Sequence, residues 1–212
     1  MTQFSKELVI FDFDGTLADT KEIAYTVYTE MARKHDIELV SKDELERIMT
    51  LPILERLKYF NVPLRKIPRL AKEAIRRIEN HIDYAPIYPN VKDTLEYLRD
   101  ENYLLYVVSS NSKKNINHFL KSYNLNVFEK VIGKASLFGK AKVIDKLIKR
   151  KRIAKDKAIY IGDEVRDIEA SKQAGVDVIA VSWGYDSYEA LKDANPTFLV
   201  KEISEIKEII QK

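Results

Sequence analysis

The sequence predicts an α/β fold: a parallel sheet covered by helices on both faces, with a helical block inserted after the first strand. Two observations support this prediction. From residue 103 onward, short apolar segments alternate with amphipathic ones, which is typical of a parallel sheet with crossover helices. Residues 19–87 instead show only helical patterns, and they follow the apolar run Leu8–Phe11, which belongs to the same sheet.

The first strand is predicted at Leu8–Phe11, a buried, β-favouring run followed by the turn residues Gly15-Thr16. Asp19 or Thr20 can then cap a helix that runs to about residue 34. Further on, Ser41 and Glu44 have the spacing of a capping box. The next helices are predicted at 52–60, 66–81 and 91–101.

The second part of the chain continues the sheet. Strands are predicted at 103–109, 130–132, 158–161 and 178–181, with a possible edge strand at 198–200. Helices are predicted at 115–123, 140–150, 164–174, 188–194 and 204–210. We therefore expect a core domain of residues 1–18 and 88–212, and an inserted helical domain of residues 19–87.

Composition limits the classes of function. The 212 residues are 45% hydrophobic and 33% charged, which is typical of a globular protein with a charge-rich surface. A net charge of +3 does not by itself predict nucleic-acid binding, and no apolar run approaches the roughly 20 residues of a membrane span. The apolar run near the amino terminus is too short for a signal peptide, and there is no cysteine. We expect a cytoplasmic monomer or homodimer, with neither a membrane nor nucleic acid as its partner.

The predicted helix at 66–81 has a basic face. Its basic residues recur at helical spacing: Arg65, Arg69, Lys72 and Arg76. We interpret them as a solvated face, and contact with an anionic substrate or nucleic acid is the alternative. The apolar residues expected on another face are Leu64, Ile67, Ala71 and Ile78.

Asp12 and Asp14 follow the first strand directly. Side chains alternate along a strand, so the two carboxylates point to the same side and Phe13 points away. They lie at the carboxyl end of a strand, where open α/β sheets bind ligands. Like charges this close are tolerated when a cation lies between them or when their protonation states differ. A pair of solvated turn residues is the alternative.

Three later segments carry further polar candidates. Val107-Val-Ser-Ser-Asn111 ends the next strand, where a hydroxyl beside free backbone amides can bind a phosphate oxygen; an ordinary helix cap is the alternative. Lys140 begins a predicted helix, which is unfavourable for the helix dipole unless an anion binds there; a surface lysine is the alternative. Asp163 and Asp167 are one helical turn apart and share a face, although helix capping alone also explains them.

Together these segments resemble the four motifs of the haloacid dehalogenase-like hydrolase superfamily. Asp-Phe-Asp-Gly-Thr at residues 12–16 matches its first motif completely, and Gly-Asp-x-x-x-Asp at residues 162–167 matches its fourth. Ser109 matches the hydroxyl residue of the second motif, with Ser110 as an alternative. Lys140 matches the lysine of the third, although Ala141 stands where relatives often have proline, so Lys142 remains open. The phosphoglycolate phosphatase-like branch is the nearest named group in overall arrangement.

The resemblance implies a three-layer Rossmann-like parallel sheet core with an inserted α-helical cap domain. It also implies a magnesium-dependent phosphatase that acts on a small phosphorylated metabolite through an aspartyl-phosphate intermediate. Asp12 would be the nucleophile and Asp14 the general acid and base. The metal ligands implied are Asp12, Asp14 through its backbone carbonyl, and Asp163, with Asp167 as support. The phosphate-binding residues implied are Gly15, Thr16, Ser109, Ser110, Asn111 and Lys140.

Other activities on this fold remain open. A phosphosugar mutase is similar in all four motifs and differs mainly in how its cap excludes water. A phosphonate-cleaving relative needs a cap lysine, and Lys21, Lys34, Lys42 and Lys58 are present without a motif around them. Dehalogenases resemble this core but lack the second aspartate, so Asp14 favours phosphoryl transfer. A non-catalytic binding protein is disfavoured because Asp12, Asp14 and Asp163 are all intact.

Overall fold

The computed structural model describes residues 6–49, 51, 53–135 and 139–211, and within them six parallel strands form one sheet. The strands are, in chain order, β1 (Leu8–Phe11), β2 (Leu104–Val108), β3 (Lys130–Ile132), β4 (Ala158–Gly162), β5 (Asp177–Val181) and β6 (Phe198–Val200). Their spatial order is β3-β2-β1-β4-β5-β6. This is the order of a doubly wound sheet, in which the winding reverses beside β1. The predicted α/β fold is confirmed.

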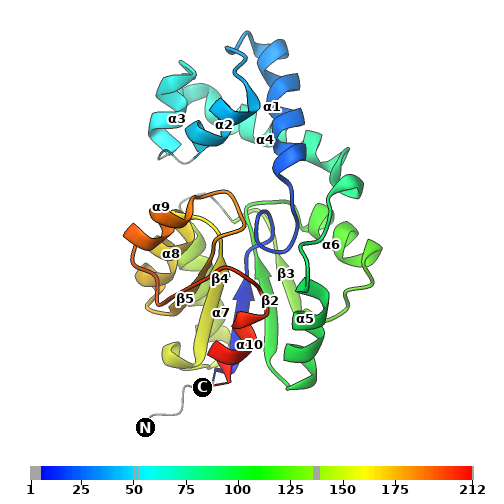
Figure 1. Cartoon of the computed structure of the whole chain (residues 1–212), viewed down its shortest axis with the longest axis vertical. Helices are drawn as coiled ribbons and strands as arrows, with labels where there is room; N and C mark the ends of the chain where they lie inside the picture. Colours follow the sequence, from blue (N-terminus) through cyan, green and yellow to red (C-terminus); the bar gives the residue numbers. More distant parts are fainter. Residues whose placement is uncertain (1–5, 50, 52, 136–138, 212) are drawn as a thin grey trace.

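Helices complete three layers (Figure 1). They are α1 (Lys21–His35), α2 (Lys42–Met49), α3 (Ile53–Tyr59), α4 (Ile67–Glu79), α5 (Val91–Asp100), α6 (Lys113–Ser122), α7 (Lys140–Lys151), α8 (Val165–Ala174), α9 (Tyr188–Asp193) and α10 (Glu205–Ile210). Buried residues of α5, α6 and α10 pack on one face of the sheet, and those of α7, α8 and α9 on the other. The predicted boundaries agree within two residues, except that Pro52, where one helix was predicted to begin, lies outside the described residues.

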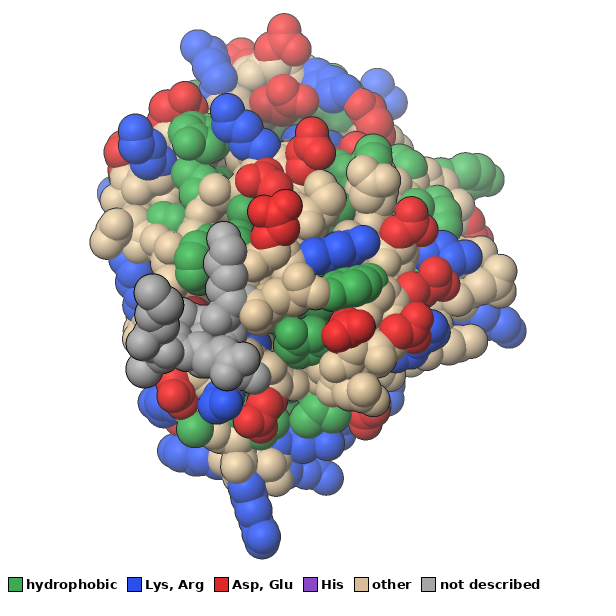
Figure 2. Space-filling view, turned by 60° about the horizontal axis from the view of Figure 1, so that its bottom comes forward, with side chains coloured by type: hydrophobic (Ala, Val, Ile, Leu, Met, Phe, Trp, Pro, Cys, Tyr) green, Lys and Arg blue, Asp and Glu red, His purple; other side chains and the backbone are tan. Residues whose placement is uncertain are grey.

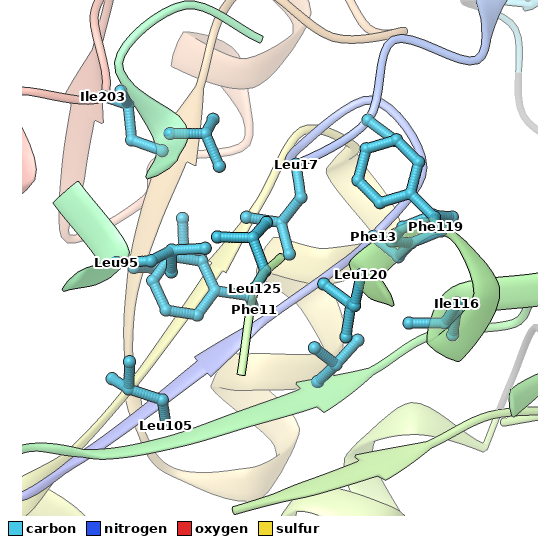
Figure 3. Close-up of a cluster of buried hydrophobic side chains, with 14 of the residues drawn as sticks. Phe11, Phe13, Leu17, Leu95, Leu105, Ile116, Phe119, Leu120, Leu125 and Ile203 are labelled. Atoms are coloured by element: carbon cyan, nitrogen blue, oxygen red, sulfur yellow. The ribbon is translucent and has the colours of Figure 1, made fainter. Parts of the chain in front are cut away.

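The core anchors β1 from both faces. Val9 and Phe11 join the cluster under α5 and α6, whereas Leu8 and Ile10 join the cluster under α7. A parallel strand covered on both faces is apolar at every position, which explains the uninterrupted run in the sequence. Phe13, one residue before Asp14, stacks edge-on against Phe119 of α6 at 5.1 Å between ring centroids (Figure 3). Phe13 therefore fixes the segment that carries the two aspartates.

Helices α1 to α4 lie together beyond the carboxyl edge of the sheet (Figure 1). The chain leaves and re-enters the core through two adjacent segments. Ala18 forms an antiparallel bridge with Ile87, and the Asp19 N–H donates to the Pro86 carbonyl at 2.8 Å. We refer to helices α1 to α4 as the cap.

An ion-pair network joins α1 to α4 within the cap. The Glu73 carboxylate accepts hydrogen bonds from Lys34 at 2.8 Å, His35 at 3.0 Å and Arg77 at 3.0 Å. These donors, Lys34 foremost, lower the pKa of Glu73 to about 2. The network therefore fixes the position of α1 relative to α4.

The basic residues of the predicted solvated face are all exposed, as that interpretation expects. The expected apolar face is wrong in part, because Leu64 and Ala71 are exposed and Leu70, Ala74 and Ile78 pack inward. Leu64 lies in the 3-10 turn of residues 64–66, before the α-helix begins at Ile67, so helical spacing does not apply to it. Leu70 and Ala71 lie on opposite sides of Ala74 and Ile78, and the Leu70 side is the one that packs.

Charges are interspersed on the face shown in Figure 2, where acidic and basic side chains alternate without a large patch of one sign. No helix in the described part of the chain combines the length and apolar character that crossing a bilayer requires.

Candidate active site

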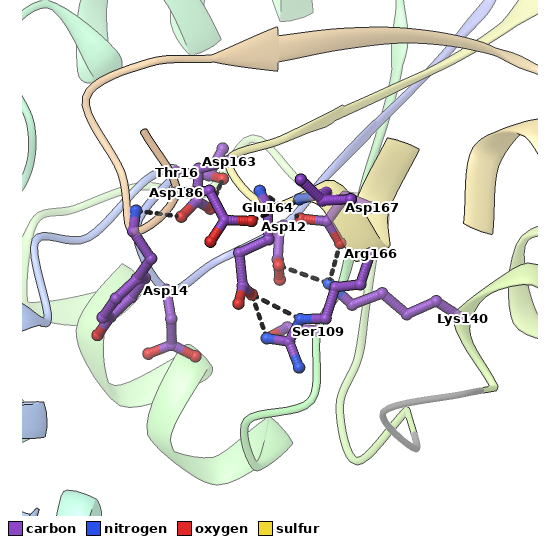
Figure 4. Close-up of polar contacts among 12 residues, drawn as sticks. Asp12, Asp14, Thr16, Ser109, Lys140, Asp163, Glu164, Arg166, Asp167 and Asp186 are labelled. Atoms are coloured by element: carbon purple, nitrogen blue, oxygen red, sulfur yellow. Dashed lines mark hydrogen bonds and ion pairs between the residues drawn. The ribbon is translucent and has the colours of Figure 1, made fainter. Parts of the chain in front are cut away.

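The register of three strands gathers the candidate residues at one edge of the sheet. Phe11 of β1 lies opposite Val107 of β2 and Ile161 of β4. Because parallel strands end at the same edge, the polar residues that follow these positions lie side by side beneath the cap (Figure 4). The site therefore occupies the point where the sheet reverses its winding.

Lys140 bridges two buried carboxylates. Its Nζ donates to Asp12 Oδ2 and to Asp167 Oδ1, both at 2.5 Å, and all three side chains are at most 3% exposed (Figure 4). Burial alone lowers the pKa of Lys140, but Asp12 and Asp167 together hold it above its ordinary value. Lys142 is exposed, so the structure brings the first of the two candidate lysines to the site.

Asp163 is held by the loop after β1 and by the loop after β5. Its Oδ1 accepts a hydrogen bond from the Thr16 hydroxyl at 2.7 Å, and its Oδ2 accepts one from the Tyr185 N–H at 2.8 Å. Gly15 has a φ of +77°, and a Cβ added there would lie 2.1 Å from Asp163 Oδ2. Only glycine fits this position. Thr16 and Gly15, expected at the phosphate, are thus both in contact with Asp163.

Asp14 is half-buried and is oriented by Asn111. The Asn111 Nδ2 donates to both Asp14 oxygens, at 3.0 and 3.1 Å. This amide cannot be flipped, because the Asn111 Oδ1 already accepts from the Ser112 N–H at 2.7 Å and from Asn115 Nδ2 at 3.0 Å. The turn after β2 therefore fixes the direction of the Asp14 carboxyl group.

Ser109 is fully buried at the end of β2, and its hydroxyl accepts the Asn111 N–H at 3.1 Å. Its neighbour Ser110 is only half-buried. All residues proposed from the sequence thus lie in or beside one cluster, with Ser110 and Lys142 farther toward solvent.

Sequence reasoning missed or left unassigned several residues of the site. Glu164 is buried, and its carboxylate accepts a hydrogen bond from Arg166 Nε at 2.6 Å. Asp186 is also buried, accepts the Val165 N–H at 2.7 Å, and lies 3.9 Å from Arg56 of the cap. An isolated aspartate in a loop carries no sequence signal, so only the fold could place Asp186 here.

Burial and mutual repulsion raise the pKa values of the acids. Burial, and next the charge of Asp12, raise the pKa of Asp14 to about 6. Burial raises the pKa of Asp167 to about 6 despite the attraction of Lys140, because Asp12 and Glu164 repel its charge. The pKa of Asp163 lies well above its ordinary value for the same reasons. A carboxyl with a pKa near 6 can exchange a proton near neutral pH.

The donor set fits a divalent cation. Among the described residues, Asp12, Asp163 and Asp167 each offer a carboxylate oxygen within 4.8 Å of the others. Glu164 is buried beside these three, and among the described residues Lys140 and Arg166 form ion pairs with members of this group of four carboxylates. Four ionised carboxylates and these two cations leave an excess charge of about −2. Hard oxygen ligands and this charge suit Mg²⁺.

Comparison with known proteins identifies the family. The profile of the haloacid dehalogenase-like hydrolases matches residues 9–181, most of the chain. The chain belongs to this family. A phosphoglycolate phosphatase of Synechococcus elongatus is 26% identical over 96% of this chain and 97% of its own length. A pyrophosphatase PpaX of Listeria monocytogenes is 25% identical over 96% of this chain and 95% of its own length.

Solved structures agree with the fold of this hydrolase. A predicted phosphatase from Clostridium acetobutylicum superposes with a TM-score of 0.85 at 25% identity, covering 98% of this chain and 100% of that one. A haloacid dehalogenase-like hydrolase of Streptococcus pneumoniae superposes with a TM-score of 0.82 at 21% identity, covering 97% and 99%. The recognition of the family from its four motifs is confirmed, as is the prediction of a hydrolase of its phosphatase group.

Proposed function

We propose that this hydrolase is a magnesium-dependent phosphatase that cleaves a phosphomonoester of a small metabolite through an aspartyl-phosphate on Asp12. One observation carries the proposal: Asp12 lies in a buried cluster with one oxygen held by Lys140, and Asp14, two residues later, has a raised pKa. A nucleophile beside a separate proton donor is the arrangement that ester cleavage in two steps requires.

In the first step Asp12 attacks the phosphorus atom in line, and the bond to the leaving oxygen breaks. Asp14, whose raised pKa of about 6 keeps a fraction of it protonated near neutral pH, gives its proton to that oxygen. In the second step a water molecule attacks the phosphorus atom of the aspartyl-phosphate, and Asp14 takes a proton from it. The bond between phosphorus and the Asp12 oxygen breaks, which releases inorganic phosphate and restores the Asp12 carboxylate. Lys140 and the Ser109 hydroxyl would neutralise the equatorial phosphoryl oxygens.

Asp12, Asp163 and Asp167 would hold the magnesium ion, together with the Asp14 carbonyl. When bound, the ion supplies charge neutralisation for the phosphoryl group and the crowded carboxylates. Thr16 and the Tyr185 N–H position Asp163 for this role, since each holds one of its oxygens.

We further propose that residues 19–87 form a cap domain on a core of residues 1–18 and 88–212. The paired segments at Ala18 and Ile87 support this division, since a pair of adjacent strands can act as a hinge. The cap would exclude water from the site and select the substrate. Of the four possible Schiff-base lysines, Lys21, Lys34 and Lys42 donate to a carbonyl or a carboxylate, and Lys58 is exposed, which disfavours phosphonate cleavage.

The proposal is tested by measuring phosphate release from a panel of phosphomonoesters, with added magnesium and with a chelator. We expect release only with magnesium, and its restoration when magnesium is returned in excess. Equal release with and without the chelator would overturn the metal requirement. Conversion of a phosphosugar to its isomer, without free phosphate, would instead indicate a mutase.

Magnesium should also stabilise the folded protein. At ten times its dissociation constant, a ligand of the native state contributes about 1.4 kcal/mol, which corresponds to a rise in Tm of about 3–6 °C for a chain of this size. Differential scanning fluorimetry would measure the rise, with sodium chloride of equal ionic strength as the control. Asp163→Asn should abolish it. An undiminished shift in that variant would contradict the assigned ligand set.

The effect of magnesium should depend on pH in a defined direction. Asp14 and Asp167 have pKa values of about 6 in the folded protein, above the ordinary value near 4. The native state therefore binds more protons than the unfolded state between about pH 4 and 6, so the metal-free protein loses stability as pH rises through that window. We expect the magnesium-induced rise in Tm to be large at pH 7.5 and small at pH 5.

Asn111→Ala should lower catalysis without unfolding the protein. The variant removes both hydrogen bonds that orient Asp14, so we expect kcat to fall about 10- to 100-fold with a smaller change in KM. Asn117→Ala, at an exposed position of α6, is the matched control. Unchanged kcat in Asn111→Ala would show that Asp14 does not depend on this contact.

A further inference from the structure

A cavity of about 690 Å³ lies between the cap helices and the loop of residues 182–187 that follows β5. The cap contributes apolar and aromatic walls: Tyr25, Tyr28, Met31, Leu45, Phe60 and Ile78. Some apolar residues of α1, α2 and α4 thus border an open space, besides those that are buried in the core. Such a volume suits a ligand much larger than a two-carbon acid.

The cavity shares a wall with the acid cluster. Gly184 and Tyr185 line it, and both touch Asp163: the Tyr185 N–H donates to this carboxylate at 2.8 Å, and a Cβ on Gly184 would lie 2.2 Å from it. The Tyr185 ring packs against Gly15 on the active-site side, where a Cβ on Gly15 would lie 2.7 Å from it. Tyr185 therefore stands at the border between the cavity and the reacting groups.

The charged groups around the cavity are already paired or opposed. Each cation that lines the cavity has a carbonyl or a carboxylate beside it: Lys21 donates to the Trp183 carbonyl, Lys42 pairs with Glu22, Arg47 lies 3.7 Å from Glu44, and Arg56 lies 3.9 Å from Asp186. Three carboxylates also line the walls: Asp43, Glu46 and Asp186. A second anionic group, such as a carboxylate or another phosphate, would lose its hydration here and meet these acids, which costs binding free energy.

We propose that the cavity receives the leaving group of the substrate, and that this leaving group has an uncharged, apolar body. This inference rests on the proposed phosphatase function, because the phosphoryl group must occupy the acid cluster for the rest of the ester to enter the cavity. The substrate class is then a phosphomonoester of an aliphatic or aromatic alcohol. It differs from phosphoglycolate and from pyrophosphate, whose leaving groups are small and anionic.

A series of alkyl phosphates tests the inference, because their leaving oxygens have similar chemistry and only the apolar length changes. We expect kcat/KM to rise about 4-fold per buried methylene, and so on the order of 10²-fold from ethyl to hexyl phosphate. 2-Phosphoglycolate should be a poorer substrate than hexyl phosphate. A flat series, or a preference for 2-phosphoglycolate, would overturn the inference while leaving the phosphatase function intact.

Ala24→Leu adds volume inside the cavity, and Ala71→Leu makes the same change on the exposed side of α4. The hexyl-to-ethyl ratio of kcat/KM should fall at least 10-fold in Ala24→Leu and stay unchanged in Ala71→Leu. Equal ratios in the two variants would contradict the cavity as the site of the leaving group. Thermal midpoints of both variants report whether either has lost its fold.

Measurements of binding test the cavity proposal separately from the phosphatase proposal. Calorimetry with hexylphosphonate and ethylphosphonate, in the presence of magnesium, measures the apolar preference without turnover. Tighter binding of hexylphosphonate, lost in Ala24→Leu, supports the cavity as the site of an apolar group. If no ester is hydrolysed as well, the phosphatase proposal fails, and the assignment of that apolar group as a leaving group fails with it. Equal affinities for the two phosphonates overturn the inference whatever the kinetics show.

Discussion

Asp12→Asn is expected to lower phosphate release by at least about 10⁴-fold, because an amide oxygen cannot serve as the phosphoryl acceptor that the two-step reaction needs. The variant should still fold, since Asp167 remains 2.5 Å from Lys140 and continues to neutralise it. The measurement is single-turnover and steady-state release of phosphate with saturating magnesium. Acid quenching followed by mass spectrometry should find a phosphorylated wild-type chain and no such species in the variant.

The control is Asp19→Asn, which changes an aspartate of the same loop that caps the start of α1 instead of joining the cluster. We expect its activity to stay within about threefold of the wild type, as for a substitution away from the reacting groups. If Asp12→Asn retained a tenth of the wild-type rate, another residue would have to be the nucleophile.

Lys140→Met is expected to have the largest effect on stability. The substitution leaves Asp12 and Asp167 buried without the cation that both contact at 2.5 Å. Removing one member of a buried ion pair costs about 3–5 kcal/mol, which corresponds to a fall in Tm of about 6–20 °C for a chain of this size. Activity should be lost as well, because the same ammonium group neutralises the phosphoryl oxygens.

The loss of stability in Lys140→Met should be smaller at low pH. Lowering the pH from 7 to 5 protonates Asp167, whose pKa burial raises to about 6, so its share of the unpaired charge is removed. Lys142→Met removes an exposed lysine of the same helix and should change Tm by no more than about 2 °C. The double variant Lys140→Met/Asp167→Asn should regain stability but not activity. Equal stability of the two single lysine variants would show that Lys140 is not the counterion of the cluster.

Local pattern alone was sufficient for much of the fold. Runs such as Leu8–Phe11 and Ala158–Gly162 are apolar at every position because helices cover both faces of a parallel strand, and such runs are visible without a structure. The buried face of α4 was predicted only in part. Leu64 lies in a 3-10 turn before the helix, and Leu70 rather than Ala71 packs beside Ala74 and Ile78. Helical periodicity does not show which of two neighbouring positions at the edge of an apolar face is buried.

The sequence by itself determined which groups meet at the candidate site. Asp12, Asp14, Asp163 and Lys140 each adjoin a strand end or a helix start, and parallel strands bring such positions to one edge whatever the remaining details. Only the tertiary structure decided the partners of these groups. Thr16 and Tyr185 hold Asp163, Asn111 holds Asp14, and the cap closes an apolar cavity beside them. Contacts between segments far apart in the chain depend on packing and loop geometry, which no local residue pattern encodes.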